Sequence, residues 1–201
     1  MKIVFATNNA HKLEEARGLA ADGIEILSLA DIGCSEELPE TSDTIEGNSF
    51  QKAFYVKSRY GYPCFSDDTG LFVDALGGAP GVYSARYAGE HCSPADNMAK
   101  LLSEMERKDD RKARFRTVVT LCCDQDFTNH RPGGPVALQF EGAVEGSIAR
   151  ERHGNGGFGY DPVFIADESG ISFAEMLPED KNAISHRGRA LRKLFDYIQK
   201  K

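Results

Sequence analysis

The sequence has no long hydrophobic run, and this absence bears on where the protein can act. Nowhere do about 18 apolar residues follow one another, the length that a membrane-spanning helix requires. The N-terminal residues MKIVFATNN contain only a short apolar run before polar residues begin, so we expect no signal peptide. We therefore expect a cytoplasmic protein that has no membrane partner.

The sequence also has fewer basic than acidic residues. The chain carries 24 Lys and Arg residues against 31 Asp and Glu residues, which gives a net charge of -7 at pH 7. A surface that binds nucleic acid or an anionic membrane needs a stripe of lysine and arginine that releases counterions. We expect no nucleic-acid partner, and a ligand that bears phosphates must meet cations concentrated at one place.

Cysteine pairs with metal-binding spacing are missing as well. The five cysteines are odd in number and include no C-x-x-C pair, which excludes a zinc ribbon and a disulfide scaffold and favours reduced thiols. No Pro/Ser-rich linker and no internal repeat divides the chain. Its 201 residues suffice for one well-buried core, so we expect a single domain, 1–201.

Apolar residues recur at two spacings, one typical of helices and one typical of strands. The helical spacing predicts helices at 13–20, 49–60, 94–105 and 186–198. Short apolar runs or alternation predict strands at 3–6, 62–65, 115–123, 138–148 and 162–166, with an acidic turn at 66–68 and an irregular connection at 124–135. Two long strands are adjacent, so we predict a mixed α/β fold with helices flanking a mixed sheet, and not a doubly wound parallel sheet.

Gly154, Gly156 and Gly159 have the spacing G-x-G-x-x-G of dinucleotide-binding dehydrogenases. In those proteins the glycines follow a strand and open a helix. Here they run into the extended sequence 162–166, so we interpret the spacing as coincidental. A glycine-rich loop that carries Phe158 and Tyr160 can instead close on a flat ligand, and a plain surface turn is the alternative.

The polar stretch TNNAHK, residues 7–12, lies between a predicted strand and a predicted helix. Free backbone N–H groups and the positive end of the helix dipole favour an anion at such a place. Lys12 adds a point charge, while Thr7 and Asn9 add hydrogen bonds. The stretch therefore predicts a phosphate site, with an ordinary helix cap at Asn9 as the alternative.

Asp67 and Asp68 follow directly on a predicted strand. Consecutive side chains of a strand point to opposite sides, so we expect one carboxylate to act and the other to support it. Two adjacent carboxylates are costly without a compensating cation, which favours Mg²⁺, with Glu40 as a second ligand. A solvated acidic turn is the alternative.

Ser185, His186 and Arg187 open the predicted C-terminal helix. Cationic residues in a first turn oppose the helix dipole by a few tenths of a kcal/mol. Hydrogen-bond donors directed at a carbonyl oxygen of a ligand would explain this placement, and Lys181 just upstream could reach a phosphate. The alternative is that exposed His and Arg are tolerated at this position.

Five motifs occur in order along nearly the whole chain: TNNAHK at 7–12, SDDTGL at 66–71, LGGAPGVYSARYAGE at 76–90, GGFGYDPVF at 156–164 and EDKNAISHR at 179–187. With these motifs the sequence resembles the non-canonical purine nucleoside triphosphate pyrophosphatases, also called inosine triphosphate pyrophosphatases or Ham1-like proteins. The resemblance implies an elongated mixed α/β fold with a long central sheet, and a homodimer. It also implies a Mg²⁺-dependent hydrolase that cleanses the nucleotide pool by converting ITP, dITP and XTP to the monophosphate and pyrophosphate.

The resemblance also implies roles for single residues. Asp68 matches the proton acceptor that activates water and, together with Glu40, the metal ligands. Residues 7–12, Lys52 and Lys181 match the positions that bind the triphosphate, whereas 158–161 with His186 and Arg187 match the pocket of the base. The full set of implied substrate-binding residues is Thr7, Asn8, Asn9, Ala10, His11, Lys12, Lys52, Thr69, Phe158, Gly159, Tyr160, Asp161, Lys181, His186 and Arg187.

The sequence departs from close bacterial relatives at two places. One is the extra polar stretch 126–135, and the other is Gly47-Asn48-Ser49 where Glu-Asn-Ala is frequent. Neither departure falls on an implied site residue. We expect them to affect only a loop and the start of the helix at 49–60.

Two other functions compete with this interpretation. A Maf-type pyrophosphatase has a related fold and would act on dTTP or UTP, but the His186-Arg187 pair argues against it. A regulatory module that binds a nucleotide without cleaving it would need no acid pair, because Asp67 and Asp68 repel a triphosphate unless a metal ion enters. The sequence favours the purine pyrophosphatase over both.

Overall fold

The computed structural model describes residues 1–125 and 132–199. The chain forms two compact units, each made of several segments. Unit 1 comprises Met1–Asp68, Thr117–Gly142 and Arg187–Lys201, and unit 2 comprises Thr69–Arg116 and Ala143–His186. Three long strands contribute residues to both units: β3 (Cys64–Val73), β5 (Lys112–Gln125) and β6 (Pro132–Ile148).

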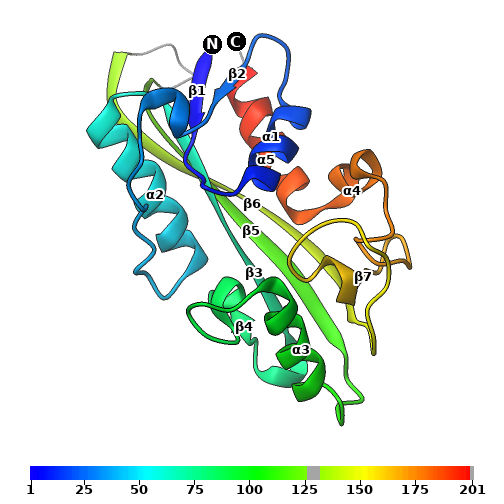
Figure 1. Ribbon diagram of the computed structural model, residues 1–201. Coiled ribbons are helices and arrows are strands. Elements are labelled where there is room, and N and C mark those ends of the chain that lie inside the picture. Colours follow the sequence, from blue (N-terminus) through cyan, green and yellow to red (C-terminus); the bar gives the residue numbers. More distant parts are fainter. Residues whose placement is uncertain (126–131, 200–201) are drawn as a thin grey trace. The chain divides into compact units, whose positions relative to one another are not determined.

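Unit 1 begins with a parallel strand–helix–strand arrangement. Strand β1 (Lys2–Phe5) pairs in parallel with β2 (Glu25–Leu27) and with β3, so the strand order in this unit is β2-β1-β3-β5-β6. Figure 1 shows helix α2 (Ile45–Tyr60) on one side of β1, with α1 (Ala10–Leu19) and α5 (His186–Gln199) on the other. Strand β1 is thus covered on both faces.

The alternation of side chains in β1 accounts for the two helix layers. Ile3 and Phe5 are fully buried in a cluster that includes Leu191 of α5. Val4 points the other way, into a second cluster that includes Val56 of α2. Because successive strand residues face opposite sides, an uninterrupted apolar run of this kind suits a strand between two layers.

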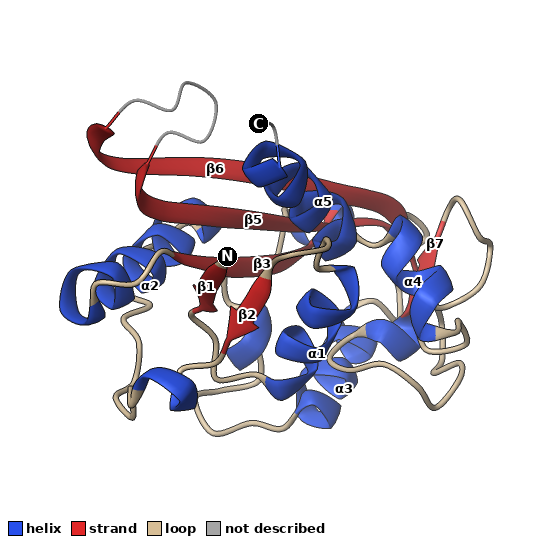
Figure 2. Ribbon diagram, turned by 90° about the horizontal axis from the view of Figure 1, so that it is seen from above, coloured by secondary structure: helices blue, strands red, loops and turns tan. Residues whose placement is uncertain are grey.

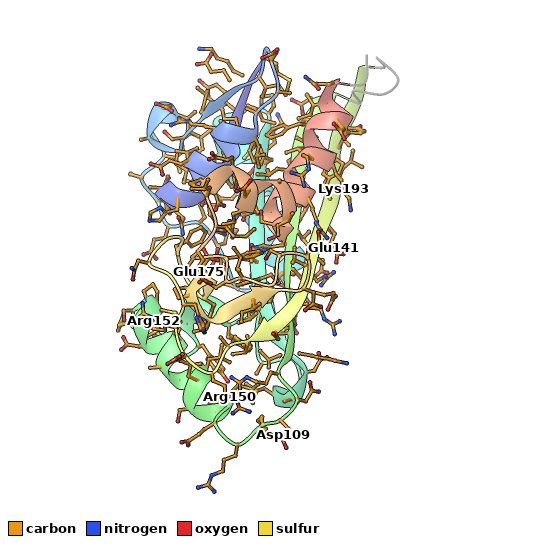
Figure 3. All side chains as sticks on the ribbon, turned by 90° about the vertical axis from the view of Figure 1, so that its right-hand side faces the viewer. Asp109, Glu141, Arg150, Arg152, Glu175 and Lys193 are labelled. Atoms are coloured by element: carbon orange, nitrogen blue, oxygen red, sulfur yellow. The ribbon has the colours of Figure 1, made fainter. Side chains whose placement is uncertain are left out.

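The long strands β5 and β6 run next to one another, as Figure 2 shows. In unit 1, Lys193 of α5 donates a hydrogen bond from Nζ to the carbonyl oxygen of Glu141 on β6, at 2.6 Å. Both residues are labelled in Figure 3. This hydrogen bond links α5 to β6.

Unit 2 has its own core beside its parts of the long strands. Its further elements are β4 (Pro80–Gly81), α3 (Pro94–Glu104), β7 (Phe164–Ala166) and α4 (Pro178–Ile184). Strand β4 pairs antiparallel with β3, and β7 pairs antiparallel with β6. Leu101 of α3 and Phe164 of β7 are fully buried in one cluster with Phe173. Ser93 and Asp96 close the start of α3 with a reciprocal capping box.

The predicted mixed α/β fold is confirmed, but several boundaries are wrong. The acidic turn at 66–68 lies inside β3, and the connection at 124–135 is shorter, because β5 continues to Gln125 and β6 begins at Pro132. Residues 126–131 of the polar stretch 126–135 lie outside the described residues. Helix α2 starts at Ile45 with Thr44 as its cap, and 161–163 form a 3-10 turn before β7. Within the described residues, no helix is long and apolar enough to span a membrane.

Candidate active site

The turn between β1 and α1 is built by local hydrogen bonds. The Asn9 side chain accepts a hydrogen bond from the Lys12 backbone N–H at 3.2 Å and so caps α1, while Thr7 Oγ1 accepts one from the Asn9 N–H at 3.2 Å. Asn8 and His11 are exposed. The cap places Lys12 in the first turn of α1, where its side chain extends toward β3.

Asp67 is the fully buried centre of an ion-pair cluster in unit 1. Lys12 Nζ lies 3.0 Å from Asp67 Oδ1, and Arg187 Nε lies 2.8 Å from Asp67 Oδ2. Arg187 also reaches Glu15 with Nη1, at 2.5 Å from Oε2. Burial raises the pKa of Asp67, but Lys12 and Arg187 outweigh burial and hold this pKa well below its usual range. Asp67 is therefore a permanent counterion for two cations.

Asp68, the next residue, meets different partners. Its Oδ1 lies 3.4 Å from Lys52 Nζ, and its Oδ2 accepts a hydrogen bond from Asn48 Nδ2 at 3.3 Å. Burial raises the pKa of Asp68 above its ordinary value, and Lys52 offsets only part of this rise. Two consecutive carboxylates whose pKa values are shifted in opposite directions are a pattern found where one acid does chemistry and the other supports it.

Lys52 joins Asp68 to Glu40, whose Oε1 lies 2.5 Å from Lys52 Nζ. Burial lowers the pKa of Lys52, but the two carboxylates outweigh burial and raise it. Glu40 and Asp68 thus converge on one buried positive charge. Two carboxylates beside substrate phosphates are the donor set with which proteins bind Mg²⁺, so these residues fit such an ion. Among residues 1–125 and 132–199, no group of three or more His, Cys, Asp or Glu side chains forms a complete metal cage.

Unit 2 contains a second polar group, set among aromatic rings. Lys181 Nζ lies 2.8 Å from Asp161 Oδ2 and 4.7 Å from the centroid of the Phe158 ring. The Phe158 backbone N–H donates a hydrogen bond to the same Asp161 oxygen at 2.7 Å. Gly157 has φ +70°, and a Cβ there would lie 2.3 Å from Asp161 Oδ2, so the turn needs glycine.

Tyr160 and His186 are buried next to this group in unit 2. The Tyr160 hydroxyl donates a hydrogen bond to the Ser84 carbonyl oxygen at 2.8 Å, which ties the motif at 156–164 to the motif at 76–90. The His186 ring stacks on Phe115, with centroids 4.5 Å apart and planes 19° apart. The aromatic packing therefore fixes the orientation of the His186 ring.

The glycine spacing at 154–159 does not open a helix. Gly154 and Gly159 have positive φ values of 74° and 63° in a loop after β6, and the loop leads into the 3-10 turn and β7. The interpretation of the spacing as coincidental is confirmed. A pyrophosphate bound as in dehydrogenases would need an α-helix N-terminus here.

The structure gathers the predicted site residues in two groups. Unit 1 brings together Lys12, Glu40, Lys52, Asp68 and Arg187, and unit 2 brings together Phe158, Asp161 and Lys181. His186 lies in the aromatic core of unit 2, and Thr69 is the first residue of that unit. Lys181, expected beside the triphosphate, has its ammonium group between a carboxylate and an aromatic ring.

Sequence reasoning missed two contacts of unit 1. Asn48 binds Asp68, and Glu15 binds Arg187. A signal for each was present, since Asn48 precedes Lys52 by four residues and Glu15 follows Lys12 by three. Residues three or four apart lie on the same face of a helix. The spacing therefore predicts that Asn48 lies beside Lys52, and Glu15 beside Lys12.

Comparisons with known proteins show the family of the chain. Residues 3–197 match the family model described as the Ham1 family. A dITP/XTP pyrophosphatase of Porphyromonas gingivalis is 51% identical, over 98% of this chain and 97% of that protein. One of Christiangramia forsetii is 49% identical over 100% of both chains. A HAM1 protein structure from Coxiella burnetii superimposes with a TM-score of 0.86 at 36% identity, covering 100% of both chains.

Proposed function

The chain belongs to the Ham1 family, and on that premise we propose that it hydrolyses non-canonical purine nucleoside triphosphates. Its substrates in this proposal are dITP, XTP and ITP, and its products are the nucleoside monophosphate and pyrophosphate. One observation carries the proposal beyond the likeness to named relatives. Asp67 and Asp68 are buried side by side with pKa values shifted in opposite directions, beside Lys12 and Lys52.

Glu40 and Asp68 would bind a divalent cation, which we propose to be Mg²⁺. Bound there, the ion supplies Lewis-acid neutralisation of phosphate oxygens. The contacts of both carboxylates with Lys52 Nζ support this choice, because they show that the two carboxylates lie near one another, as two ligands of one ion must. Mg²⁺ prefers such carboxylate oxygens and retains waters and phosphates as its other ligands.

Asp68 acts as the proton acceptor in this proposal. It orients a water molecule and takes a proton as the water attacks the α-phosphorus in line with the leaving pyrophosphate. A raised pKa suits a general base better than a lowered one, since the ideal catalytic pKa lies near the working pH. Asp67 cannot replace it, because Lys12 and Arg187 keep Asp67 ionised and occupied.

The triphosphate binds to residues 7–12 and Lys52 in this proposal. Backbone N–H groups at the start of α1 favour an anion, and the Asn9 cap gives that turn a fixed shape. Lys12 and Lys52 neutralise the negative charge that grows on the leaving pyrophosphate, which is a main source of acceleration in phosphoryl transfer. Lys181 has the same role by resemblance, and its pairing with Asp161 means that a phosphate must compete with that carboxylate.

In this proposal the base binds to residues 158–161 with His186, all of unit 2, whereas Arg187, which the resemblance also assigns to the base, contacts Asp67 and Glu15 in unit 1. The Phe158 ring stacks on the purine and supplies affinity for any purine. A 6-keto oxygen accepts hydrogen bonds, whereas the 6-amino group of adenine would set donor against donor. Donors around the base therefore select hypoxanthine and xanthine over adenine.

We further propose that the two units work as one domain in a cytoplasmic homodimer. The chain passes between the units four times, at 68–69, 116–117, 142–143 and 186–187, which supports one functional domain.

Phe50 and Phe54 stack on α2 with 40% and 53% of their surfaces exposed, an apolar patch of the kind that a dimer contact covers. The cytoplasm is where nucleotide triphosphates are consumed.

A nucleotide panel tests the proposal. Purified protein with Mg²⁺ is given dITP, XTP, ITP, ATP, GTP, dTTP and UTP, and pyrophosphate and phosphate are detected separately. We expect pyrophosphate release from dITP, XTP and ITP and far slower release from ATP. Turnover of dTTP or UTP would favour the Maf-type function, and nucleotide binding without turnover would favour a regulatory module.

A further inference from the structure

Asn48 is a buried polar side chain next to the proposed base, and neither the sequence motifs nor the proposed mechanism uses it. It is 1% exposed, on the second turn of α2. Its Nδ2 donates a hydrogen bond to Asp68 Oδ2 at 3.3 Å, and its Oδ1 accepts one from the Ser42 backbone N–H at 2.9 Å. The orientation of the amide is therefore determined by both neighbours, since an exchange of N and O would lose both hydrogen bonds.

Asn48 and Lys52 lie one helical turn apart and divide the Asp68 carboxylate between them. Lys52 contacts Oδ1, and Asn48 contacts Oδ2. Each of the two side chains also contacts the segment before α2, Lys52 through Glu40 and Asn48 through the Ser42 N–H. Two donors on separate oxygens fix both the position and the rotation of a carboxylate, which one donor alone does not do.

We infer that Asn48 is a positioning residue, whose amide sets the rotation of the Asp68 carboxylate for its work on water. The inference rests on the proposed function, because it assigns a task to Asp68. Asn48 touches neither substrate nor metal in this account. Its contribution is geometric, and a catalytic group turned out of line by a small movement can lose about 10²-fold in rate.

Gln51 provides a matched control on the same helix. Its side chain accepts a hydrogen bond from the Thr41 N–H at 3.0 Å and donates one to Thr41 Oγ1 at 3.0 Å. It thus ties α2 to the same segment that Asn48 contacts. Both of these hydrogen bonds go to Thr41, so Gln51→Ala loosens the segment without removing a contact of the Asp68 carboxylate.

The test compares kcat and KM for dITP in Asn48→Ala, Asn48→Asp and Gln51→Ala, with the melting temperature of each variant measured in parallel. For Asn48→Ala we expect kcat to fall by about 10- to 100-fold with KM changed less than about threefold, because orientation is lost and binding is kept. For Gln51→Ala we expect both parameters within about twofold of the wild type, as for a surface substitution.

Asn48→Asp separates positioning from mere support of the fold. Aspartate has the same shape and still accepts the hydrogen bond from the Ser42 N–H, but it sets a second carboxylate against Asp68 in place of a donor. We expect kcat to fall at least as far as in Asn48→Ala, although the hydrogen bond from the Ser42 N–H is kept. A kcat of Asn48→Asp within twofold of the wild type would overturn the inference, and so would equal losses in Asn48→Ala and Gln51→Ala.

These outcomes differ from failure of the proposed function. If the proposed function is wrong, wild-type protein releases no pyrophosphate from dITP, whatever residue 48 is. If only the positioning role is wrong, the wild type is active. The Asn48 variants then show a higher KM or a lower melting temperature, without a selective fall in kcat. Assays are run well below the lowest melting temperature of the set, so that folded protein is compared with folded protein.

Discussion

The polar group around Asp67 and Asp68 in unit 1 and the polar group around Lys181 and Asp161 in unit 2 consist of different kinds of side chains. In unit 1, Asp67 and Asp68 form ion pairs with Lys12, Arg187 and Lys52 over 2.8 to 3.4 Å, and the Asn48 amide is an uncharged donor to Asp68. In unit 2, a single pair between Lys181 and Asp161 lies against the rings of Phe158 and Phe173. The first set of contacts suits phosphates, and the second suits a flat uncharged base. The variants that follow test this contrast, beginning with the largest expected effect.

Asp68→Asn should remove catalysis and spare the fold. We expect kcat for dITP to fall by about 10³-fold or more, because general-base catalysis is worth about 10² to 10⁴ and the substitution also removes a proposed metal ligand. Asparagine keeps the shape of the side chain and an oxygen that can accept from Asn48, and Glu40 remains as a partner of Lys52, so we expect a folded variant. Steady-state kinetics measures the fall in kcat, and urea unfolding measures the free energy of unfolding. Normal turnover in this variant would contradict the assignment.

Arg187→Ala should produce the largest loss of stability. It leaves Asp67 and Glu15, which Arg187 contacts at 2.8 and 2.5 Å, without this partner. Removal of one member of a buried ion pair costs about 3 to 5 kcal/mol. Urea unfolding measures the change in the free energy of unfolding.

Arg114→Ala is the control for that loss. Arg114 contacts Asp74 at 3.1 Å, but both side chains are more than 40% exposed. An exposed pair contributes about 0 to 1 kcal/mol, so we expect little change in stability. Equal losses in the two arginine variants would remove the distinction between buried and exposed pairs.

Phe158→Ala should have a smaller effect, confined to binding. Base stacking on an aromatic ring contributes about 1 to 3 kcal/mol, which corresponds to a KM higher by about 5- to 150-fold. The rise should be similar for ITP, XTP and dITP, because every purine offers the same face to the ring. Steady-state kinetics with the three substrates measures it. A rise limited to one of them would show that Phe158 discriminates between bases.

Local features of the site could be predicted from the sequence. The strand, polar turn and helix at 2–19 follow from apolar spacing and the Asn9 cap, which act over a few residues. Gly61 ends α2 with φ +75°, as its position predicts. The mixed character of the sheet follows from the adjacent long strands β5 and β6.

Contacts between distant residues were the part that the sequence could not predict. The sequence predicts Asp67 and Asp68 in a turn, whereas both lie inside β3, where two adjacent acids are unfavourable without cations. The cations that make the strand possible at Asp67 are 55 and 120 residues away in sequence, at Lys12 and Arg187. The contact of Asn48 with Asp68 also joins residues far apart in sequence, 20 positions, and only the spacing of Asn48 from Lys52 on α2 was a local signal for it.

Hydrolysis of dITP in ¹⁸O-labelled water tests the central claim most directly, because the label reports which phosphorus the water attacks. If water attacks the α-phosphorus, the label enters the nucleoside monophosphate and the pyrophosphate stays unlabelled, as mass spectrometry of the two products would reveal. Label in pyrophosphate, or release of labelled orthophosphate, would place the attack elsewhere in the triphosphate and would contradict the account.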